Sequence, residues 1–557
     1  MPPAPQPLDR LGRVLAVAVG TLAIGSFALA CFVPIYTDEI AWKIIQSRVT
    51  QDGGMSPPLS LEPSCGPYSF AVPMLLYPFR WADSLVFGAM TSPLALRLLG
   101  FGTALAWLVL AGALATNIGR PRLSRGVVAA GLLALATIGV MPFLLVISRP
   151  EQVLLIALTC FLYPLLKPVS VPPSLGRALV LAVGGWALCS YALAAHPRAA
   201  FAVPLMLLFI WSITRRPRIA GCAGAGILAV AFVSYRDFAL RVACPGDPDI
   251  AALFVKINIG SALDQGKLLP YLKDVLFSLR RTAGWYINEF TLRSKYASDM
   301  LPGFSHPLLG WAVELFFSLL VVAGIAAFLL LAARFRRERE TRLAVAGVGA
   351  LWFFYFACVG SRILKFDYEA ELMEPVMAMA ALSSLWLAWP RLILRFGGAR
   401  VAVAARGALI ILLALSVASQ GWLLINDAPY AWGAWKKPGY AAGQAFSITT
   451  FGYGRLKAQI LATARLCGID PAASPHHLVV DELTYFALAN AYEPFFMTYF
   501  DENGWRQGLG DPRPLWRAGK SAGMVVACQR TQSVFADAVT RNGAFCCLPN
   551  FSSPTSE

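Results

Sequence analysis

Long apolar blocks constrain this chain more than any other feature of its sequence. Stretches such as Val14 to Val33, Trp311 to Ala333 and Val401 to Ile425 carry hardly a charge, and each is long enough to cross a hydrocarbon core of about 30 Å. Of the 557 residues, 57% are hydrophobic and only 14% are charged, whereas soluble domains carry about 25% charged residues. The sequence therefore predicts a mainly α fold, a polytopic helical bundle in a membrane.

The apolar blocks predict about eleven transmembrane helices. They lie at residues 13–34, 93–117, 126–147, 151–168, 177–195, 199–214, 219–236, 309–333, 343–360, 374–390 and 402–425. With Arg10 and Arg13 on the inner side, an odd number of crossings places the C-terminus on the outer side. The first block has an alternative interpretation as a signal peptide, because Ala28 to Cys31 faintly resembles a lipoprotein cleavage site.

The formal charge of +16 does not predict nucleic-acid binding, which needs basic residues gathered on one soluble face. Here Lys and Arg separate the apolar blocks and fall in alternate connections, as expected of loops on the inner side. The lipid bilayer is therefore the expected partner, and nucleic acid is not. These inner residues are Arg120, Arg122, Arg125, Lys167, Arg177, Arg215, Arg216, Arg218, Arg334 to Arg342, Arg391, Arg395 and Arg400.

Two parts follow from this topology: a membrane module at 1–425, with outer loops 35–92, 237–308 and 361–375, and a soluble domain at 426–557. In the second part, strand-like runs alternate with helical ones, which predicts a small α/β domain. Asp481 and Glu482 follow a predicted strand, where they could bind a ligand at the end of a sheet or lie in a solvated loop.

Eleven cysteines divide by position. Five lie inside apolar blocks and are expected to be packing residues. The other six lie in outer segments, where disulfides persist, although their pairing does not follow from spacing. The outer six are Cys65, Cys244, Cys467, Cys528, Cys546 and Cys547.

Three outer segments are predicted to form short helices at the bilayer surface, one of which is Ala251 to Ile259. Residues 36–45 place apolar side chains at helical spacing behind the acidic pair Asp38 and Glu39. Leu268 to Trp285 in the loop 237–308 is a second such segment. Asp38 and Glu39 would then begin a helix near the outer lipid boundary.

Charged residues gather at the predicted outer ends of several helices. No Walker loop, GxGxxG, HExxH or GxSxG motif occurs, so the usual nucleotide-binding and hydrolase sites are not indicated. If the bundle brings the outer ends together, these residues line one outward-facing site. They are Asp38, Glu39, Arg149, Glu151, His196, Arg198, Arg362 and Lys365.

Four short motifs resemble the GT-C superfamily of polyprenyl-phosphate-sugar-dependent glycosyltransferases, which includes protein O-mannosyltransferases and the aminoarabinose transferases of lipid A. The resemblance spans roughly residues 13–425, while the C-terminal domain has no such counterpart. The motifs are the acidic pair after the first helix, Ser148-Arg149-Pro150-Glu151, His196-Pro197-Arg198, and Lys365-Phe366-Asp367-Tyr368 followed by Pro375.

The resemblance implies an inverting glycosyltransferase of the bacterial inner membrane, with its C-terminal domain on the periplasmic side. A polyprenyl-phosphate-linked sugar would be the donor, and a glycan, lipid or protein the acceptor. Transfer needs a base for the acceptor hydroxyl and a positive partner for the departing phosphate.

By carry-over from the family, Asp38 is the expected base, Glu39 orients it or helps to hold a divalent cation (Mg or Mn), and Glu151 is a second acid. Several relatives carry Asp where this chain has Glu151. The phosphate would be bound by a set of mainly basic residues. These are Arg149, His196, Arg198, Arg362, Lys365 and Tyr368.

Each of these residues also has a purely structural interpretation. Asp38 and Glu39 could simply begin a surface helix, Ser148 to Glu151 forms a capping-box sequence, and His196 could simply end a helix. One functional alternative is a transporter or flippase of lipid-linked or anionic substrates, which also needs outward-facing arginines. Another is a structural or assembly protein whose function lies in its C-terminal domain. Few charges lie inside the predicted helices, whereas ion-coupled carriers usually keep some there.

Overall fold

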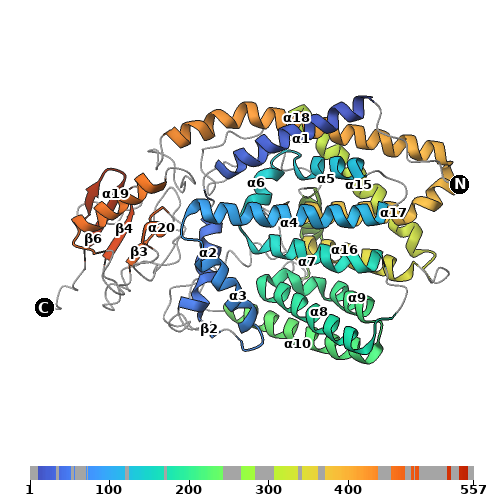
Figure 1. The fold of residues 1–557 in the computed structure, drawn as a ribbon, viewed down its shortest axis with the longest axis horizontal. Helices are drawn as coiled ribbons and strands as arrows, with labels where there is room; N and C mark the ends of the chain where they lie inside the picture. The colour runs from blue at the N-terminus through green and yellow to red at the C-terminus, as the bar shows by residue number, and fades with distance from the viewer. Residues whose placement is uncertain are drawn as a thin grey trace.

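A bundle of long helices makes up most of the molecule, and a small sheet lies beyond one end of it (Figure 1). The computed structural model describes the following residues of the chain. These are 10–32, 35, 37–51, 55–56, 70–71, 73–119, 125–167, 172–242, 265–280, 282, 307–335, 341–361, 370–436, 453–470, 478–481, 483–488, 523–528 and 539–549.

The described helices run from the N-terminal region to the C-terminal unit in the order of their labels. Their bounds are α1 Arg10–Phe32, α2 Thr37–Gln51, α3 Tyr77–Gly88, α4 Pro93–Gly119, α5 Arg125–Ala136, α6 Met141–Val146, α7 Pro150–Leu166, α8 Leu175–Ala195, the 3-10 helix η2 Pro197–Ala202, α9 Val203–Thr214, α10 Pro217–Val242, α13 Leu268–Arg280, α15 Pro307–Ala332, α16 Arg342–Ser361, α17 Ala370–Phe396, α18 Gly398–Lys436, α19 Tyr453–Leu466 and α20 Tyr485–Leu488.

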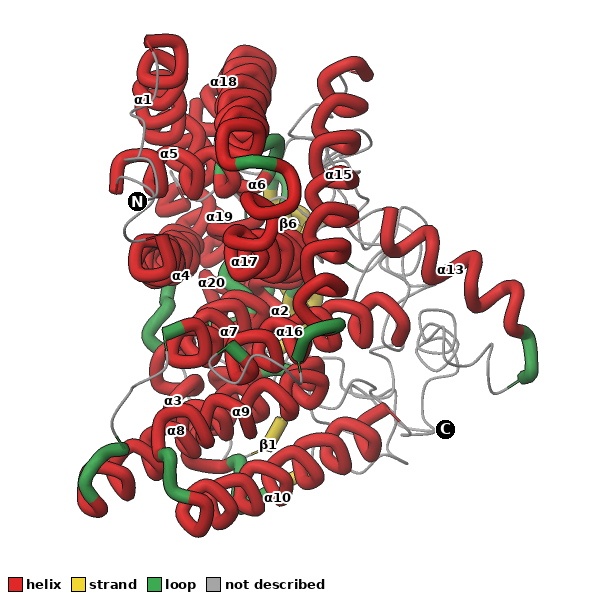
Figure 2. Tube along the Cα trace, turned by 90° about the vertical axis from the view of Figure 1, so that its right-hand side faces the viewer, coloured by secondary structure: helices red, strands yellow, loops and turns green. Residues whose placement is uncertain are grey.

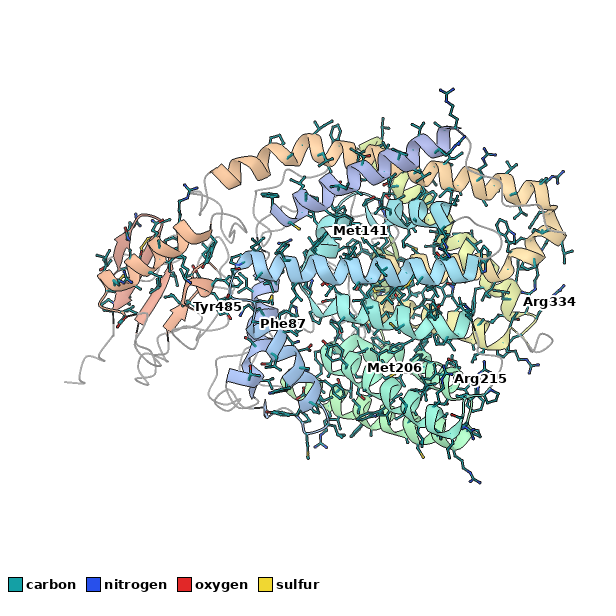
Figure 3. The ribbon with its side chains drawn as sticks, viewed as in Figure 1. Phe87, Met141, Met206, Arg215, Arg334 and Tyr485 are labelled. Atoms are coloured by element: carbon teal, nitrogen blue, oxygen red, sulfur yellow. A yellow bond between two sulfur atoms is a disulfide. The ribbon has the colours of Figure 1, made fainter. Side chains whose placement is uncertain are left out.

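Nine helices in the described part of the chain are long and apolar enough to cross a membrane. They coincide with nine of the predicted segments, and the shorter apolar helices α5 and α7 occupy the other two positions. The prediction of a polytopic, mainly α membrane bundle is confirmed. Arg215 and Arg334 lie at the end of the bundle opposite the sheet (Figure 3), as expected if the basic loops share one side.

One predicted helix is broken in two. The segment 126–147 forms α5 and α6, separated by a turn in which Gly139 adopts a left-handed conformation with φ of 57°. Glycine takes this conformation without the steric cost that a side chain brings. Hydropathy alone does not reveal such a break, because the turn is as apolar as the helices beside it.

Polar side chains join α1, α18 and the turn after α5 inside the bundle. Ser26 of α1 donates a hydrogen bond to Oε1 of Gln420 in α18, and Nε2 of Gln420 donates to Ser416 one turn away. The Ser416 hydroxyl also contacts Thr137, which follows α5, at 3.0 Å. Within lipid, satisfied polar contacts of this kind hold helices together because apolar burial alone does not distinguish a helix from acyl chains.

Helices α2 and α3 lie crosswise to the bundle, at the end nearer the sheet (Figure 1). The prediction that residues 36–45 lie on the lipid surface is wrong for Ile40, which is fully buried. Ile40 shares a hydrophobic core with Phe87, Leu96 and residues of the C-terminal unit. The covering unit comes from a distant part of the chain, so helical spacing alone could not show it.

The second segment predicted as a surface helix, Leu268 to Trp285, forms α13 over Leu268–Arg280. This helix lies beside α15 and α16 at the edge of the bundle (Figure 2). Nε of Arg280 is 3.0 Å from Oε1 of Glu314 in α15, which fixes the end of α13 to the bundle.

The C-terminal unit contains a four-stranded sheet with strand order β3-β4-β6-β5. Strand β3 is parallel to β4, and the other two pairings are antiparallel. Helix α19 packs on this sheet, as the predicted α/β domain requires. The strands are β3 Leu478–Val480, β4 Gly523–Ala527, β5 Thr540–Asn542 and β6 Phe545–Pro549; a separate pair, β1 Met55–Ser56 and β2 Phe70–Ala71, lies near α2.

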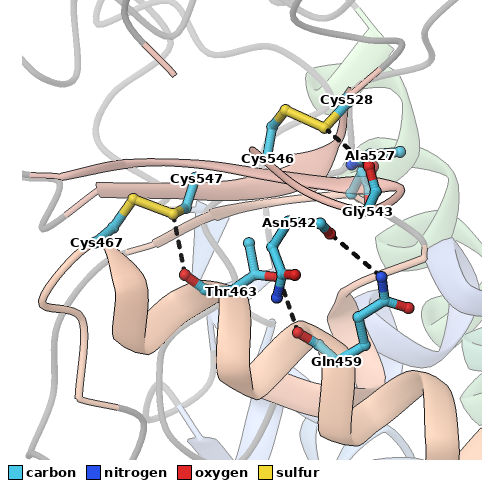
Figure 4. The surroundings of a disulfide bond; sticks show 10 residues. Gln459, Thr463, Cys467, Ala527, Cys528, Asn542, Gly543, Cys546 and Cys547 are labelled. Carbon is cyan, nitrogen blue, oxygen red and sulfur yellow. Dashed lines mark hydrogen bonds between the residues drawn. A yellow bond between two sulfur atoms is a disulfide. The ribbon is translucent and has the colours of Figure 1, made fainter. Parts of the chain in front are cut away.

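Two disulfides close the C-terminal unit (Figure 4). Cys467, directly after α19, is bonded to Cys547 of β6, and Cys528, directly after β4, is bonded to Cys546. Four of the six cysteines that the sequence assigns to outer segments are therefore disulfide-bonded, while Cys65 and Cys244 lie outside the described residues. The cysteines of the apolar blocks are free, as expected of packing residues: Cys31, Cys160, Cys189, Cys222 and Cys358.

Asp481 is neither a ligand-binding nor a solvated acid. It is fully buried, and its Oδ1 accepts hydrogen bonds from the backbone N–H groups of Leu483 and Thr484 at 3.1 and 3.0 Å. Its Oδ2 accepts from the N–H of Ala527 in β4 at 2.7 Å. Asp481 therefore ties the turn after β3 to the neighbouring strand. Glu482 lies outside the described residues.

Candidate functional site

An ion pair between α2 and α4 forms one half of the site. Nη2 of Arg97 is 2.7 Å from Oε2 of Glu39, and the two side chains are 1% and 0% exposed. Glu39 lies in the first turn of α2 and Arg97 in the first turns of α4. Such a pair is held only where geometry and further hydrogen bonds offset the cost of removing both charges from water. Glu39 is therefore not a solvated helix-start acid.

The backbone of Ser148 supplies that further hydrogen bond. Its N–H donates to Oε1 of Glu39 at 3.1 Å. A capping box would instead join the side chains of Ser148 and Glu151 to each other's backbone, but the N-cap residue of α7 is Arg149, in an extended conformation and without a side-chain cap. The capping-box interpretation of Ser148 to Glu151 is therefore wrong.

A glycine lets α4 approach the turn before α7. A Cβ atom built on Gly100 would lie 2.0 Å from the carbonyl oxygen of Val146 and 3.1 Å from the nitrogen of Ser148. Gln152, in the first turn of α7, strengthens this contact because its Nε2 donates to the carbonyl of Leu145 and its Oε1 accepts from Thr103 of α4. The backbone of α4 thus fixes Ser148 against Glu39.

The second half of the site is centred on Glu151. Nη2 of Arg149 donates to its Oε1 at 2.9 Å, and Nε2 of His196 is 3.5 Å from the same oxygen. Arg198, also buried, is within electrostatic reach of Glu151. The other oxygen, Oε2, is buried and has no hydrogen-bond partner among the described residues. A buried acceptor of this kind can take a hydrogen bond from a bound hydroxyl group.

His196 joins α8 to η2 and orients its ring toward Glu151. Its Nδ1 accepts the backbone N–H of Arg198 at 3.0 Å, so a neutral ring carries its proton on Nε2, which is the nitrogen nearest Glu151. Burial lowers the pKa of His196, and the Glu151 carboxylate opposes this shift. His196 is therefore placed to donate a hydrogen bond to Glu151 rather than merely to end a helix.

Consecutive residues connect the two halves, since Ser148 contacts Glu39 and Arg149 contacts Glu151. Of the residues predicted from sequence, the structure gathers a set at one end of the bundle: Glu39, Arg149, Glu151, His196 and Arg198. The backbone of Asp38 belongs to the first turn of α2, but its side chain lies outside the description. Arg362, Lys365 and Tyr368 also lie outside the described residues.

Two functional candidates were missed from the sequence. Arg97 is a fully buried cation inside an apolar helix, and ionisable residues in such positions are functional candidates by default. Glu374, in the first turns of α17, is 2% exposed, and neither of its carboxylate oxygens has a hydrogen-bond partner in the described ranges. The signal for both was present, since each is a charge within or beside a predicted span.

The residues that the structure describes fit a divalent cation poorly. Both oxygens of Glu39 already accept hydrogen bonds, from Arg97 and from Ser148, and a guanidinium at 2.7 Å repels a cation. No group of three or more His, Cys, Asp or Glu residues within the described ranges could hold a metal ion. The expected metal ligand that is left is Asp38.

Among the comparisons with known proteins, only solved structures are similar to this chain. No family model and no curated protein matches this sequence. The oligosaccharyltransferase of Archaeoglobus fulgidus is similar in its apo form, with 12% identity and a TM-score of 0.41 over 91% of this chain and 69% of that one. The complex of this enzyme, AglB, with an inhibitory peptide and a dolichol-phosphate gives 13% and 0.41 over the same shares of the two chains.

The complex of the Archaeoglobus fulgidus enzyme with Zn and sulfate gives 11% identity and a TM-score of 0.43, over 95% of this chain and 69% of that one. Similarity at this level does not establish a shared family. The site belongs to a multi-pass helical membrane protein with a small C-terminal α/β unit.

Proposed function

We propose that this protein is an inverting glycosyltransferase that moves a sugar from a polyprenyl-phosphate donor to a glycan, lipid or protein acceptor, at the periplasmic face of a bacterial inner membrane. The observation that carries the proposal is the buried charge cluster at one end of an apolar bundle. Three arginines, Arg97, Arg149 and Arg198, share it with two carboxylates, Glu39 and Glu151. A lipid-linked phosphate is an anion that must be bound beside lipid.

The arginines suit a departing phosphate. These five side chains carry a net positive charge before any ligand binds, because three guanidinium groups outnumber two carboxylates. Guanidinium groups bind phosphate oxygens through paired hydrogen bonds, and in a site shielded from water these are stronger than at a surface. Arg149 and Arg198 are the proposed phosphate ligands, with Arg362, Lys365 and Tyr368 completing the set. His196 keeps Glu151 in place.

In the proposed reaction, the Asp38 carboxylate takes the proton of the acceptor hydroxyl. The hydroxyl oxygen bonds to the anomeric carbon as the bond from that carbon to the phosphate oxygen breaks, and the polyprenyl phosphate leaves with the electron pair. A single displacement inverts the anomeric configuration. Glu39 acts by holding Arg97 and the Ser148 turn. The Oε2 atom of Glu151, which has no hydrogen-bond partner among the described residues, is suited to accept a hydrogen bond from a sugar or acceptor hydroxyl. No step passes through a metal.

The test is transfer of radiolabelled sugar from a panel of polyprenyl-phosphate donors by membranes that contain matched amounts of wild type or Asp38→Asn. The substitution keeps the shape of the side chain and removes the base, so we expect the rate to fall by a factor of about 10²–10⁴. Asp470→Asn, at an exposed acid of the C-terminal unit, is the matched control. Equal transfer by wild type and Asp38→Asn would show that Asp38 is not the base.

Glu374 favours a second candidate, a transporter of lipid-linked or anionic substrates. A buried carboxylate without a hydrogen-bond partner in the described part of the chain is typical of ion-coupled carriers. Glu374→Gln separates the two functions. If the protein is a glycosyltransferase, the variant retains most sugar transfer per folded molecule. If it is a carrier, the variant loses proton- or cation-driven substrate movement in proteoliposomes. In that case wild type transfers no sugar from any donor.

A further inference from the structure

Helix α3 buries polar side chains and exposes apolar ones, which is the reverse of a helix at a water surface. Its inward positions include Asp83, which is 4% exposed, and Ser84, which is fully buried. Its outward side chains are large and apolar, and Trp81 and Leu85 are 45% and 48% exposed. A helix at a water surface shows the opposite arrangement. The outward set, including the turn just before the helix, is Met74, Leu75, Tyr77, Trp81, Leu85 and Val86.

The inward groups Asp83 and Ser84 of α3 are both engaged with neighbouring helices. The Ser84 hydroxyl donates to the carbonyl of Ser47 at 2.7 Å and accepts the N–H of Thr50 at 2.8 Å, which fixes α3 to α2. Asp83 accepts a hydrogen bond from the hydroxyl of Tyr191 in α8. Polar groups that turn inward and find protein partners are what a helix in contact with lipid requires.

The outward face of α3 continues the exposed apolar surface of α8. In the first half of α8, Val180 and Val183 are 72% and 65% exposed, as expected where a membrane-spanning helix meets acyl chains. In its second half, α3 covers the helix, since the ring of Phe79 packs on Trp186 with centroids 6.1 Å apart and Asp83 binds Tyr191. Helix α3 thus takes the place that lipid occupies along the first half.

We propose that the outward face of α3 is embedded in the lipid leaflet at the site end of the bundle, with acyl chains as its partner. At 12 residues, the helix is about 18 Å long and too short to cross a core of about 30 Å, so it lies along the boundary, crosswise to the bundle (Figure 1). Tyr77 and Trp81 are the residue types that gather at this boundary. This interaction does not depend on glycosyl transfer.

The lipid contact has a consequence for the site. Helix α3 is hydrogen-bonded to α2 through Ser84, and α2 carries Glu39 in its first turn. The lipid contact of α3 is therefore coupled through α2 to the segment that carries Glu39.

The experiment is photo-crosslinking of the full chain in nanodiscs of palmitoyl-oleoyl phosphatidylcholine, with benzoylphenylalanine in place of Leu85. Val183 of α8, in a membrane-spanning helix, is the positive control. Leu466 of α19, which is 60% exposed on the C-terminal unit, is the negative control. We expect the mass of one phospholipid to be added at Leu85 and Val183 and not at Leu466.

A lipid adduct at Val183 with none at Leu85 overturns the proposal, and so does a protein dimer cross-linked through Leu85. A second measurement uses a charge at the same position. Leu85→Asp is expected to lower the midpoint of thermal unfolding in nanodiscs, whereas Leu466→Asp leaves it unchanged. Equal midpoints for the two variants contradict the lipid contact even where cross-linking yields are low.

Discussion

The site end of the bundle and the C-terminal unit both bury acids, but they give them different partners. In the C-terminal unit, Asp481 is satisfied by backbone N–H groups from its own turn and from β4. At the site end, Glu39 and Glu151 are paired with arginine side chains. Backbone donors fix a turn and cannot be redirected, whereas arginines can be shared with an incoming anion. The difference distinguishes an acid that supports the fold from acids suited to binding.

The same two regions are also held together differently. The C-terminal unit has two disulfides, as is common in small domains that lack a large core. In the described part of the bundle, the cysteines are free and the helices rely on apolar packing with a few polar contacts. Loss of a buried polar contact should therefore destabilise the bundle, whereas loss of a disulfide should destabilise the C-terminal unit.

The largest effect is expected from Glu39→Gln. Removing the charge leaves Arg97 buried without its counter-charge, which should lower the free energy of unfolding by about 3–5 kcal/mol. Thermal unfolding in detergent or nanodiscs, followed by loss of the monodisperse fraction, measures this change.

The double variant Glu39→Leu with Arg97→Met is the control for the ion pair. Since it removes both charges and keeps apolar volume, it should regain most of the lost stability. Because Glu39 also holds the Ser148 turn beside Arg149, this stable double variant should remain impaired in sugar transfer. Full activity in the double variant would show that the pair serves the fold alone.

The second prediction addresses the C-terminal unit. Replacing Cys528 and Cys546 by serine removes the disulfide between residues 18 positions apart. The unfolded chain is then less constrained, and the free energy of unfolding of the C-terminal unit should fall by about 3 kcal/mol. Limited proteolysis should then cut within residues 453–549 while the bundle stays intact. Substitution of two free cysteines of the bundle, Cys160 and Cys189, by alanine is the matched control. If the bundle is digested together with the C-terminal unit, the two regions are not stabilised separately.

The sequence was sufficient to predict the membrane spans, because twenty apolar residues have few alternatives to lipid. It also identified Glu39, Arg149, Glu151, His196 and Arg198, which the structure brings to one end of the bundle. The partner of Glu39 was not predicted, because Arg97 lies inside a block that hydropathy assigns to the bilayer. An isolated charge in such a block is nevertheless a usable signal.

Other features depend on contacts between distant segments. The burial of α2 beneath the C-terminal unit requires Ile40 and Lys43 to meet residues more than 400 positions away. The role of Asp481 depends on the N–H of Ala527. The inverted polarity of α3 becomes visible only when its inward face is known from Tyr191 and Ser47. Local spacing carries none of this information.

The third prediction tests the role of Asp481. In Asp481→Asn, the amide group replaces an acceptor opposite the N–H of Ala527, so two donors face each other or one bond is lost. The C-terminal unit should lose about 1–3 kcal/mol, seen as faster hydrogen exchange in β3 and β4. Asp470→Asn, at an exposed acid of the same unit, should change nothing. Sugar transfer per folded molecule is expected to be unaffected, in contrast to the Glu39 variants.

The smallest effect is expected where the two regions meet. Nζ of Lys43 in α2 donates to the hydroxyl of Tyr485 at 3.1 Å and lies 5.1 Å from the centre of its ring. Burial lowers the pKa of Lys43 from 10.5 to about 8. Between pH 8 and pH 10.5, Lys43 is protonated in the unfolded chain and neutral in the folded chain. The folded contact therefore becomes more stable as the pH rises through this range. Below it, the folded contact carries the full cost of a buried charge.

Hydrogen exchange of α20, measured on both sides of the Lys43 pKa, tests the contact. In wild type, exchange should slow as pH rises from about 8 toward 10, after correction for the intrinsic rate, and Lys43→Met should remove this dependence. Tyr485→Phe keeps the ring and loses one hydrogen bond, at a cost of about 1 kcal/mol, and should keep the pH dependence. An unchanged pH profile in Lys43→Met would mean that another group titrates at this contact, and that the α2 charge does not link the bundle to the C-terminal unit.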